Sequence, residues 1–259
     1  MTINAATALP YVLDRAVTIN ATPAVVFGFL SDSVRWAAWW GEGSTVDPRP
    51  GGRVFIRHPG GIEAEGEVLE ISRPERFVFT LGYTSGKPMP IGSSRVTIRL
   101  APQAGGTRVI VTHELAEEAV RDQHVQGWRY QLSLFANAVA NEVSAGAGTA
   151  VDAWFRAWST PDAAELERQL ASVAGADVRF RDRFSAVEGL SELVPHVLAA
   201  QRFMPGLRLE RSGDLRHCQG TLLVDWSAIG PDGQPRGAGT NVFVLDADGR
   251  FASVTGFWR

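Results

Sequence analysis

Apolar and polar positions in the first part of the chain predict one strand followed by two short helices. Residues 11–20 alternate between apolar and polar side chains, as a half-buried strand does. Thr22 can then cap a helix, and Pro23 suits its first turn because a proline lacks the N–H that this position leaves unpaired. A second short helix follows and is expected to end at Gly41.

The next stretch predicts a meander of strands and then a long helix. Across residues 50–115, turn residues recur about every 8 to 12 positions between short alternating runs, which is typical of an antiparallel sheet. A helix is expected at about residues 120–141, with an apolar stripe that includes Trp128, Leu132 and Phe135 at helical spacing. A sheet with a long helix across it encloses a cavity unless side chains fill the space, so we expect a pocket between them.

The second part of the chain reverses this order, with helices before strands. Small residues at 143–149 predict a short linker. Residues 150–201 carry three helical segments around one short strand, and residues 207–258 carry four strands separated by turns, the first of them over residues 207–211. Helices followed by a bent antiparallel sheet predict a second α+β domain.

Composition narrows the classes of function. The 259 residues suffice for two domains, and 45% hydrophobic residues allow each domain a core. The formal net charge is -3 and neither half is a basic block, which argues against binding to nucleic acid or to a membrane surface. Cys218 is the only cysteine, so neither an intrachain disulfide nor a cysteine-based zinc site can form. Residues 1–10 lack the pattern of a signal peptide, and no apolar run approaches the roughly 18 residues that span a bilayer, so we expect a cytoplasmic protein without membrane insertion.

Several short motifs occur in one order along the first part of the chain. They are Ile19-Asn20-Ala21-Thr22-Pro23, Trp39-Trp40-Gly41, Pro50-Gly51-Gly52-Arg53, Glu65-Gly66-Glu67, Pro74-Glu75-Arg76-Phe77, Gly106-Thr107-Arg108, and His124 with Gly127-Trp128. Over residues 11–142 they resemble the START-like (SRPBCC) branch named after the activator of heat shock protein 90 ATPase. The resemblance implies a helix-grip domain, in which a curved antiparallel sheet and a long C-terminal helix enclose a pocket for a hydrophobic small molecule.

A second set of motifs follows in the last part of the chain. They are Trp158-Ser159-Thr160-Pro161-Asp162, Asp177-Val178-Arg179-Phe180, Gly239-Thr240-Asn241-Val242-Phe243 and Val254-Thr255-Gly256-Phe257-Trp258. They resemble the SnoaL-like branch of the nuclear-transport-factor-two-like superfamily, which implies an α+β cone domain and a homodimer formed through it. The whole chain is thus expected to be α+β, with a START-like domain at residues 11–142, a linker at 143–149 and a SnoaL-like cone domain at 150–259.

Candidate pocket residues follow from these two folds. Those in the first domain are Trp40, Arg99, His113, Trp128 and Leu132, and those in the second are Trp158 and Trp258. Tryptophans that face a cavity suit an aromatic ligand and Arg99 can orient one, although tryptophans more often form the core and strand arginines more often face solvent. His58, His113 and His124 share no helical or strand spacing, so no metal site is expected, and no cofactor motif is present.

One set of residues in the second part has the placement of the catalytic site in cone-fold ketosteroid isomerases. That resemblance implies that Asp182 takes a proton next to a carbonyl, while Asn241 and Trp154 donate hydrogen bonds to the oxyanion. The alternative is structural: Asp182 starts a turn or pairs with Arg181 or Arg183, Trp154 belongs to the core, and Asn241 satisfies a strand end. The tyrosine that usually donates in that family is absent, which favours the structural alternative.

Three functions remain open on the sequence. The favoured one is a two-domain binding protein that holds a hydrophobic or aromatic small molecule in the START-like cavity, and whose SnoaL-like domain dimerises or binds a second ligand. The alternatives are a polyketide cyclase or isomerase that uses Asp182 as general base, and a chaperone-associated interaction protein. No motif decides whether the chain is an enzyme.

Overall fold

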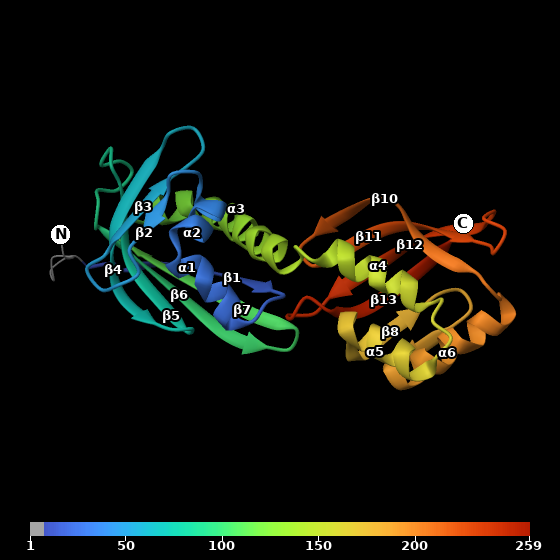
Figure 1. Cartoon of the computed structure of the whole chain (residues 1–259). Helices are drawn as coiled ribbons and strands as arrows, with labels where there is room; N and C mark the ends of the chain where they lie inside the picture. Colours follow the sequence, from blue (N-terminus) through green and yellow to red (C-terminus); the bar gives the residue numbers. More distant parts are fainter. Residues whose placement is uncertain (1–7) are drawn as a thin grey trace. The chain divides into compact units, whose positions relative to one another are not determined.

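The computed structural model describes residues 8–259, and contacts divide the chain after Ala140 into two units. We call residues 8–140 unit 1 and residues 141–259 unit 2. Each unit combines helices with one sheet, so the chain is of the α+β class (Figure 1). Residues 1–7, part of the segment in which no signal peptide is predicted, lie outside the described residues. Within residues 8–259, no helix is both long enough and apolar enough to cross a membrane.

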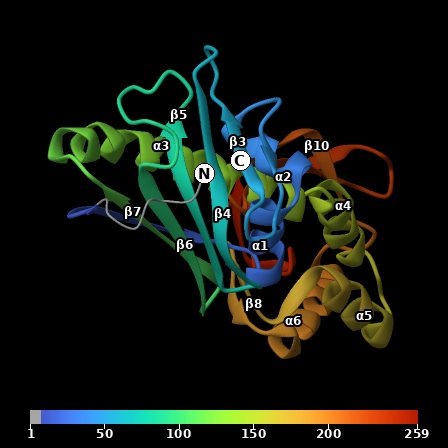
Figure 2. The same cartoon turned by 90° about the vertical axis from the view of Figure 1, so that its left-hand side faces the viewer.

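Unit 1 is built on a seven-stranded antiparallel sheet. Its elements in chain order are β1 (Tyr11–Ile19), α1 (Pro23–Ser31), α2 (Ser33–Trp40), β2 (Thr45–Val46), β3 (Arg53–Arg57), β4 (Glu63–Ser72), β5 (Arg76–Tyr83), β6 (Ser94–Gln103), β7 (Gly106–Leu115) and α3 (Glu118–Val143). The strand order is β1-β7-β6-β5-β4-β3-β2, and Figure 2 shows β4, β5, β6 and β7 following one another across the sheet. The predicted meander is confirmed, because each strand from β3 to β6 pairs with the next along the chain.

Local side-chain bonds determine where the first two helices begin and end. The hydroxyl of Thr22 accepts the backbone N–H three residues on, and Pro23 occupies the first turn of α1. The carboxylate of Asp32 caps α2 in the same way, at 3.0 Å. α2 ends at Gly41, whose φ of 133° is a conformation that favours glycine. The predicted helix start at Thr22 and helix end at Gly41 are therefore confirmed.

α3 is fixed to the rest of unit 1 by its buried stripe. Trp128, Leu132 and Phe135 are each at most 4% exposed, as their spacing predicts. The ring of Phe135 packs against that of Trp39, with centroids 4.6 Å apart. The indole Nε1 of Trp128 donates a hydrogen bond at 3.0 Å to Nδ1 of His113 on β7, so the helix is tied to the sheet as well as to α2.

Unit 2 is built on a six-stranded sheet in the order β10-β11-β12-β13-β8-β9. Its elements are α4 (Ala147–Ala157), α5 (Ala163–Val173), β8 (Ala174–Arg181), β9 (Ala186–Glu188), α6 (Leu190–Phe203), β10 (Arg208–Cys218), β11 (Thr221–Ile229), β12 (Pro235–Leu245) and β13 (Phe251–Trp258). The sheet is not wholly antiparallel as predicted, because β13 and β8 pair in parallel. No turn connects these two strands, so the local sequence holds no signal for their relative direction.

Two element boundaries in this region differ from those expected. α4 begins at Ala147, within the predicted linker, which leaves residues 144–146 between α3 and α4. β10 continues to Cys218, although a strand is predicted only as far as residue 211. Residues 210–214 are exposed on an edge strand and pack against no core. Their side chains therefore need not alternate between apolar and polar, and the sequence shows no strand pattern there.

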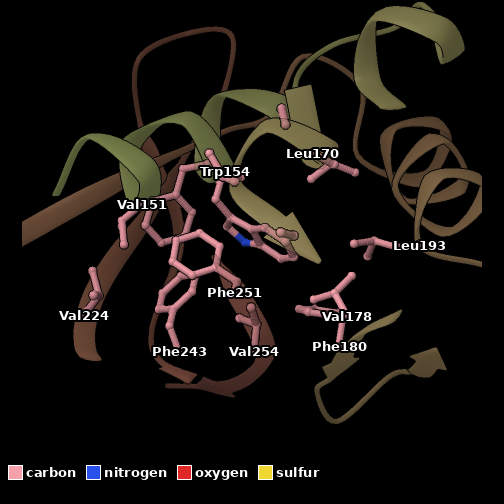
Figure 3. Close-up of a cluster of buried hydrophobic side chains, with 14 of the residues drawn as sticks. Val151, Trp154, Leu170, Val178, Phe180, Leu193, Val224, Phe243, Phe251 and Val254 are labelled. Atoms are coloured by element: carbon pink, nitrogen blue, oxygen red, sulfur yellow. The ribbon is translucent and has the colours of Figure 1, made fainter. Parts of the chain in front are cut away.

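The core of unit 2 is an aromatic cluster around Trp154 (Figure 3). The ring of Trp154 on α4 lies 6.2 Å from that of Phe180, 6.0 Å from that of Phe243 and 5.8 Å from that of Phe251, centroid to centroid. These three phenylalanines come from β8, β12 and β13, so one helix residue contacts three neighbouring strands. Trp154 is completely buried, and the cluster therefore holds α4 on the sheet.

Candidate ligand-binding cavity

Unit 1 contains a cavity of about 360 Å³ beside α3. Its lining residues are Trp40, His58, Pro59, Ile62, Leu81, Tyr83, His124, Gly127, Trp128, Tyr130, Gln131 and Leu134. None of these is an aspartate, glutamate, lysine or arginine. Trp40, Leu81 and Trp128 are at most 5% exposed, whereas Ile62 and Tyr130 are 58% and 63% exposed, so the cavity has a buried floor and an apolar rim.

α3 faces the cavity with a second stripe of side chains, next to its buried one. The cavity-lining members are His124, Gly127, Gln131 and Leu134, at steps of three, four and three residues. The buried stripe that begins at Trp128 anchors the helix. Because the cavity stripe mixes an imidazole, a glycine, an amide and a leucine, it has no hydrophobic periodicity that the sequence would reveal.

Gly127 leaves space in the middle of α3. A glycine inside a helix costs about 0.5–1 kcal/mol relative to alanine, so its presence is unfavourable for the helix itself. A Cβ built on Gly127 would have no heavy atom within 4 Å beyond its own helix neighbourhood. Gly127 is exposed and lines the cavity, so its missing side chain leaves open space at the cavity rim.

Tyr83 on β5 and His124 on α3 form a hydrogen-bonded pair in the cavity. The hydroxyl oxygen of Tyr83 lies 3.2 Å from Nε2 of His124, and Nδ1 of His124 lies 2.7 Å from the carbonyl oxygen of Val120. Burial raises the pKa of Tyr83, and burial lowers the pKa of His124 against the opposing effect of the Val120 carbonyl. Both side chains are therefore neutral at neutral pH.

The end of β5 is positioned by the loop that follows it. The backbone N–H of Tyr83 donates to the carbonyl of Met89 at 2.9 Å. Gly82 permits this approach, because a Cβ there would lie only 1.9 Å from the carbonyl oxygen of Pro90. The loop thus fixes the backbone from which the Tyr83 side chain reaches into the cavity.

His113 lies behind the cavity floor and is locked in one tautomer. Its Nδ1 accepts the indole N–H of Trp128, so its proton is on Nε2, which donates to the hydroxyl of Ser94 at 2.8 Å. The Ser94 hydroxyl donates in turn to the carbonyl of Leu81 at 2.8 Å. Burial, with a smaller effect from nearby His124, lowers the pKa of His113 to about 3. This neutral histidine thus holds Trp128 in place directly and Leu81 through the hydroxyl of Ser94.

Two further polar groups lie at the cavity wall. Burial is the main cause that lowers the pKa of His58, whose ring packs edge-on against Trp40 at 5.7 Å between centroids. The indole Nε1 of Trp40 is buried and has no hydrogen-bond partner among residues 8–259. A buried donor left unpaired costs about 1–3 kcal/mol, so a ligand oxygen that reached this N–H would offset that cost.

The residues predicted for the first pocket are only partly brought together. Trp40 and Trp128 line the cavity. His113 lies directly behind Trp128, and Leu132 belongs to the buried stripe of α3 instead of the lining.

Arg99 lies on the other face of the sheet. Along β6, Ser94 faces His113, whereas Arg95 and Arg99 are at odd steps from it and are exposed. Arg99 lines a separate hollow of about 470 Å³ on that outer face, together with Arg76 and Arg95. The predicted placement of Arg99 beside the START-like cavity is therefore wrong, because the alternation of β6 turns its side chain away.

The gathering of the histidines is the feature that sequence spacing missed. His58 follows β3 and His124 lies on α3, yet both line the cavity, and the ring of His113 is 5.3 Å from that of His124. Tyr83 completes the polar group and is marked by no motif. Among residues 8–259, no three His, Cys, Asp or Glu side chains are placed to hold a metal ion.

In unit 2, Trp158 and Trp258 line one small cavity of about 40 Å³. Its other lining residues are Ala200, Gln201, Met204, Leu207 and Leu209. The indole Nε1 of Trp158 is buried without a hydrogen-bond partner in the described part of the chain. The two predicted residues thus share a cavity, but its volume suits about one water molecule and is well below that of a ligand pocket.

Asp182 holds a turn just after β8. Its Oδ1 accepts the backbone N–H groups of Phe184 and Ser185 at 2.8 Å each, and the Ser185 hydroxyl at 3.0 Å. Its Oδ2 accepts the indole N–H of Trp258 at 3.2 Å. Within residues 8–259 no ion pair to Asp182 is present, and Arg181 instead lies 3.9 Å from Glu188. The turn alternative accounts for these bonds, and the ion-pair alternative does not.

The structure brings Asn241 close to Asp182 and leaves Trp154 in the core. A Cβ built on Gly256 would lie 3.1 Å from Oδ1 of Asn241 and 3.4 Å from Cβ of Asp182. Asn241 is 5% exposed inside β12, and its Oδ1 accepts the indole N–H of Trp226 at 2.8 Å. Trp154 is enclosed by aromatic rings (Figure 3). A catalytic role for these three residues stays a prediction.

We expect Asp182→Ala to lower the free energy of unfolding of unit 2 by about 1–3 kcal/mol, because two backbone N–H groups, one hydroxyl and the indole N–H of Trp258 lose their acceptor. Asp182→Asn is the matched control: its amide oxygen can replace Oδ1, so it is expected to cost less. Chemical denaturation of both variants measures the difference. An Asp182→Ala protein as stable as the wild type would mean that the turn does not depend on the carboxylate.

Comparison with known proteins finds a family match for the part of the chain that contains the cavity beside α3. Residues 20–140 match the family described as Activator of Hsp90 ATPase homolog 1-like protein. Residues 20–140 are thus AHSA1-like. The matched residues include every side chain that lines the 360 Å³ cavity. None of the curated proteins compared with the chain matches it.

Solved structures resemble the chain over about half its length each. The AHSA1 protein from Silicibacter pomeroyi is 25% identical and covers 51% of this chain and 99% of its own, with a TM-score of 0.44. The Aha1 dimer from Colwellia psychrerythraea is 16% identical and covers 50% of this chain and 96% of its own, with a TM-score of 0.44. A SnoaL-like family protein from Agrobacterium tumefaciens is 25% identical and covers 43% of this chain and 95% of its own, with a TM-score of 0.41.

Proposed function

We propose that unit 1 binds an uncharged, largely apolar small molecule in the cavity beside α3. The observation that carries the proposal is the cavity itself: about 360 Å³, with a floor of Trp40, Leu81 and Trp128 and no formally charged side chain in its lining. Indole rings offer flat apolar contact to an aromatic ligand. A charged ligand would lose its hydration here without gaining a counter-charge, so the lining disfavours it.

The size of the cavity restricts the ligand further. Ligand pockets commonly measure about 300–1,000 Å³, so this one is at the lower end of the range. A molecule of one or two rings suits this volume better than a long lipid does. The polar groups available to it are concentrated at Tyr83, His124, His58 and Trp40, which allows a small number of oriented hydrogen bonds.

We propose that unit 2 is a SnoaL-like cone domain at residues 150–259, which follows a START-like domain at residues 11–142. The motifs around Trp158, Asn241 and Trp258 and the order of helices before strands support this assignment. Its role as the site of a homodimer is likewise a proposal, tested by sedimentation of the whole chain. In unit 2 the cavity lined by Trp158 and Trp258 measures about 40 Å³, and a separate open hollow of about 480 Å³ is lined by the polar residues Asp177, Arg179 and Glu188 together with Gly189 and Ala252.

Binding in the cavity is tested best by filling it from α3. Gly127→Phe is expected to weaken binding of 2-naphthol, an uncharged two-ring probe, by about tenfold or more, because the added ring occupies the ligand's place. Gly127→Ala is the matched control: it is expected to bind the probe as the wild type does and to stabilise the helix by about 0.5–1 kcal/mol. Isothermal titration calorimetry measures both affinities.

Two outcomes would count against the proposal. If the phenylalanine and alanine variants bound the probe equally well, the ligand site would lie elsewhere. If native mass spectrometry of the purified wild-type protein found no bound small molecule and calorimetry found no binding of the probe, unit 1 would need another function.

A further inference from the structure

The hydrogen bonds around His124 fix which way the Tyr83 hydroxyl donates. Nδ1 of His124 lies 2.7 Å from the carbonyl oxygen of Val120, and a carbonyl oxygen only accepts. Nδ1 therefore carries the proton, and in the neutral imidazole Nε2 has only a lone pair. The Tyr83 hydroxyl, 3.2 Å from that Nε2, must donate to it. Its one proton is then used, and its oxygen can only accept from any further partner.

That oxygen is an acceptor without a donor. The structure shows no other hydrogen bond to the Tyr83 hydroxyl among residues 8–259, and both Tyr83 and His124 line the cavity. The oxygen of a hydroxyl that donates to an imidazole is a stronger acceptor than an isolated one, because the two bonds polarise each other. A ligand group facing this oxygen is therefore favoured if it carries an O–H or N–H.

We propose that the cavity selects uncharged aromatic molecules that bear a hydroxyl group, and that Tyr83, oriented by His124, is the residue that recognises it. This inference rests on the proposed binding function and names the ligand class of that same site. The ligand hydroxyl donates to the Tyr83 oxygen, while its ring lies against the floor formed by Trp40 and Trp128. The absence of any formally charged lining residue favours the neutral hydroxyl over its anion.

A pair of isosteric probes separates this inference from simple apolar binding. 2-Naphthol and 2-fluoronaphthalene have nearly the same shape, but only 2-naphthol has a proton to donate. We expect the wild-type protein to prefer 2-naphthol by about five- to tenfold in Kd, measured by calorimetry at pH 7.5. In Tyr83→Phe, made together with His124→Phe so that the Nε2 freed by the change cannot accept in its place, the ratio of the two affinities is expected to shift towards 2-fluoronaphthalene by the same factor, because a ring remains at both positions and the acceptors are lost.

Tyr11→Phe is the matched control, since it removes the same hydroxyl from a tyrosine on β1 that does not line the cavity. It is expected to leave the affinity ratio unchanged, and a ratio that shifted in this variant but not in Tyr83→Phe would overturn the assignment to Tyr83. Equal binding of both probes by the wild type would overturn the hydroxyl preference and leave the binding function standing. Failure of both probes to bind would overturn the binding function and this inference with it. Thermal melts of the variants confirm that each is folded before its affinities are compared.

Discussion

Lowering the pH from 6.5 to 5 is expected to remove about 2 kcal/mol from the free energy of unfolding of unit 1 through His113 alone. The pKa of His113 is about 3 in the folded protein because the ring is buried, while in the unfolded chain it is near 6.5. The unfolded state thus takes up the proton first, so the stability is complete above pH 6.5 and declines as the pH falls towards 3, where the loss reaches about 5 kcal/mol. The lowered pKa values of His58 and His124 act in the same direction.

The contribution of His113 is obtained by comparison with His113→Gln, which does not titrate in this range. The amide of glutamine can still accept from the indole of Trp128 and donate to Ser94, so it is the conservative replacement. Carboxylates also titrate below pH 5, but they are common to both proteins and cancel in the difference. Because the chain has two units, hydrogen exchange of peptides from β7 and α3 is a better measure than a single global transition. Parallel pH profiles for the two proteins would show that His113 is not held neutral by burial.

The order of elements in unit 1 was predictable because each signal is local. Thr22 and Pro23 mark the start of α1, and Gly41 marks the end of α2, through bonds and backbone angles within a few residues. The stripe from Trp128 to Phe135 marks the buried side of α3 in the same way. Such features depend on neighbours along the chain, so the sequence displays them directly.

Pairing between distant strands was not predictable in this way. β8 and β13 lie in parallel although most of unit 2 separates them along the chain. β10 extends through exposed polar residues because its partner β11 supplies the hydrogen bonds, and no apolar side chain is needed there. Both features depend on which backbone lies alongside, and apolar alternation carries no information about that.

Only some residues of the candidate site were predictable from the sequence, for a related reason. Trp40 and Trp128 were candidates because tryptophans that face a cavity suit an aromatic ligand, and both line the cavity. Tyr83 and His124 meet only because the end of β5 and the cavity stripe of α3 converge, and neither has a periodic partner. Arg99 shows the opposite error: its strand was predicted, but a shift of one residue in the alternation decides the face.

Replacing Trp154 by alanine is expected to lower the free energy of unfolding of unit 2 by about 3–5 kcal/mol. The indole is completely buried and contacts rings from β8, β12 and β13, so its removal leaves a cavity in the middle of the aromatic cluster. Since a domain is commonly stable by only about 5–15 kcal/mol, much of this unit is expected to be unfolded in the variant. Trp154→Phe retains an aromatic ring and is expected to cost markedly less.

This pair of variants separates the structural reading of Trp154 from the catalytic one. A residue that serves as an oxyanion donor is needed for its N–H, which phenylalanine lacks, whereas a core residue is needed for its volume, most of which phenylalanine keeps. We therefore expect stability to fall steeply from the wild type to Trp154→Ala, with Trp154→Phe close to the wild type. Hydrogen exchange of peptides from α4 and β12 measures the stability of unit 2 in each variant. If Trp154→Ala proved as stable as Trp154→Phe, the core role would be refuted, and the closeness of Asp182 and Asn241 around Gly256 would then make the proton-transfer hypothesis the better account of this region.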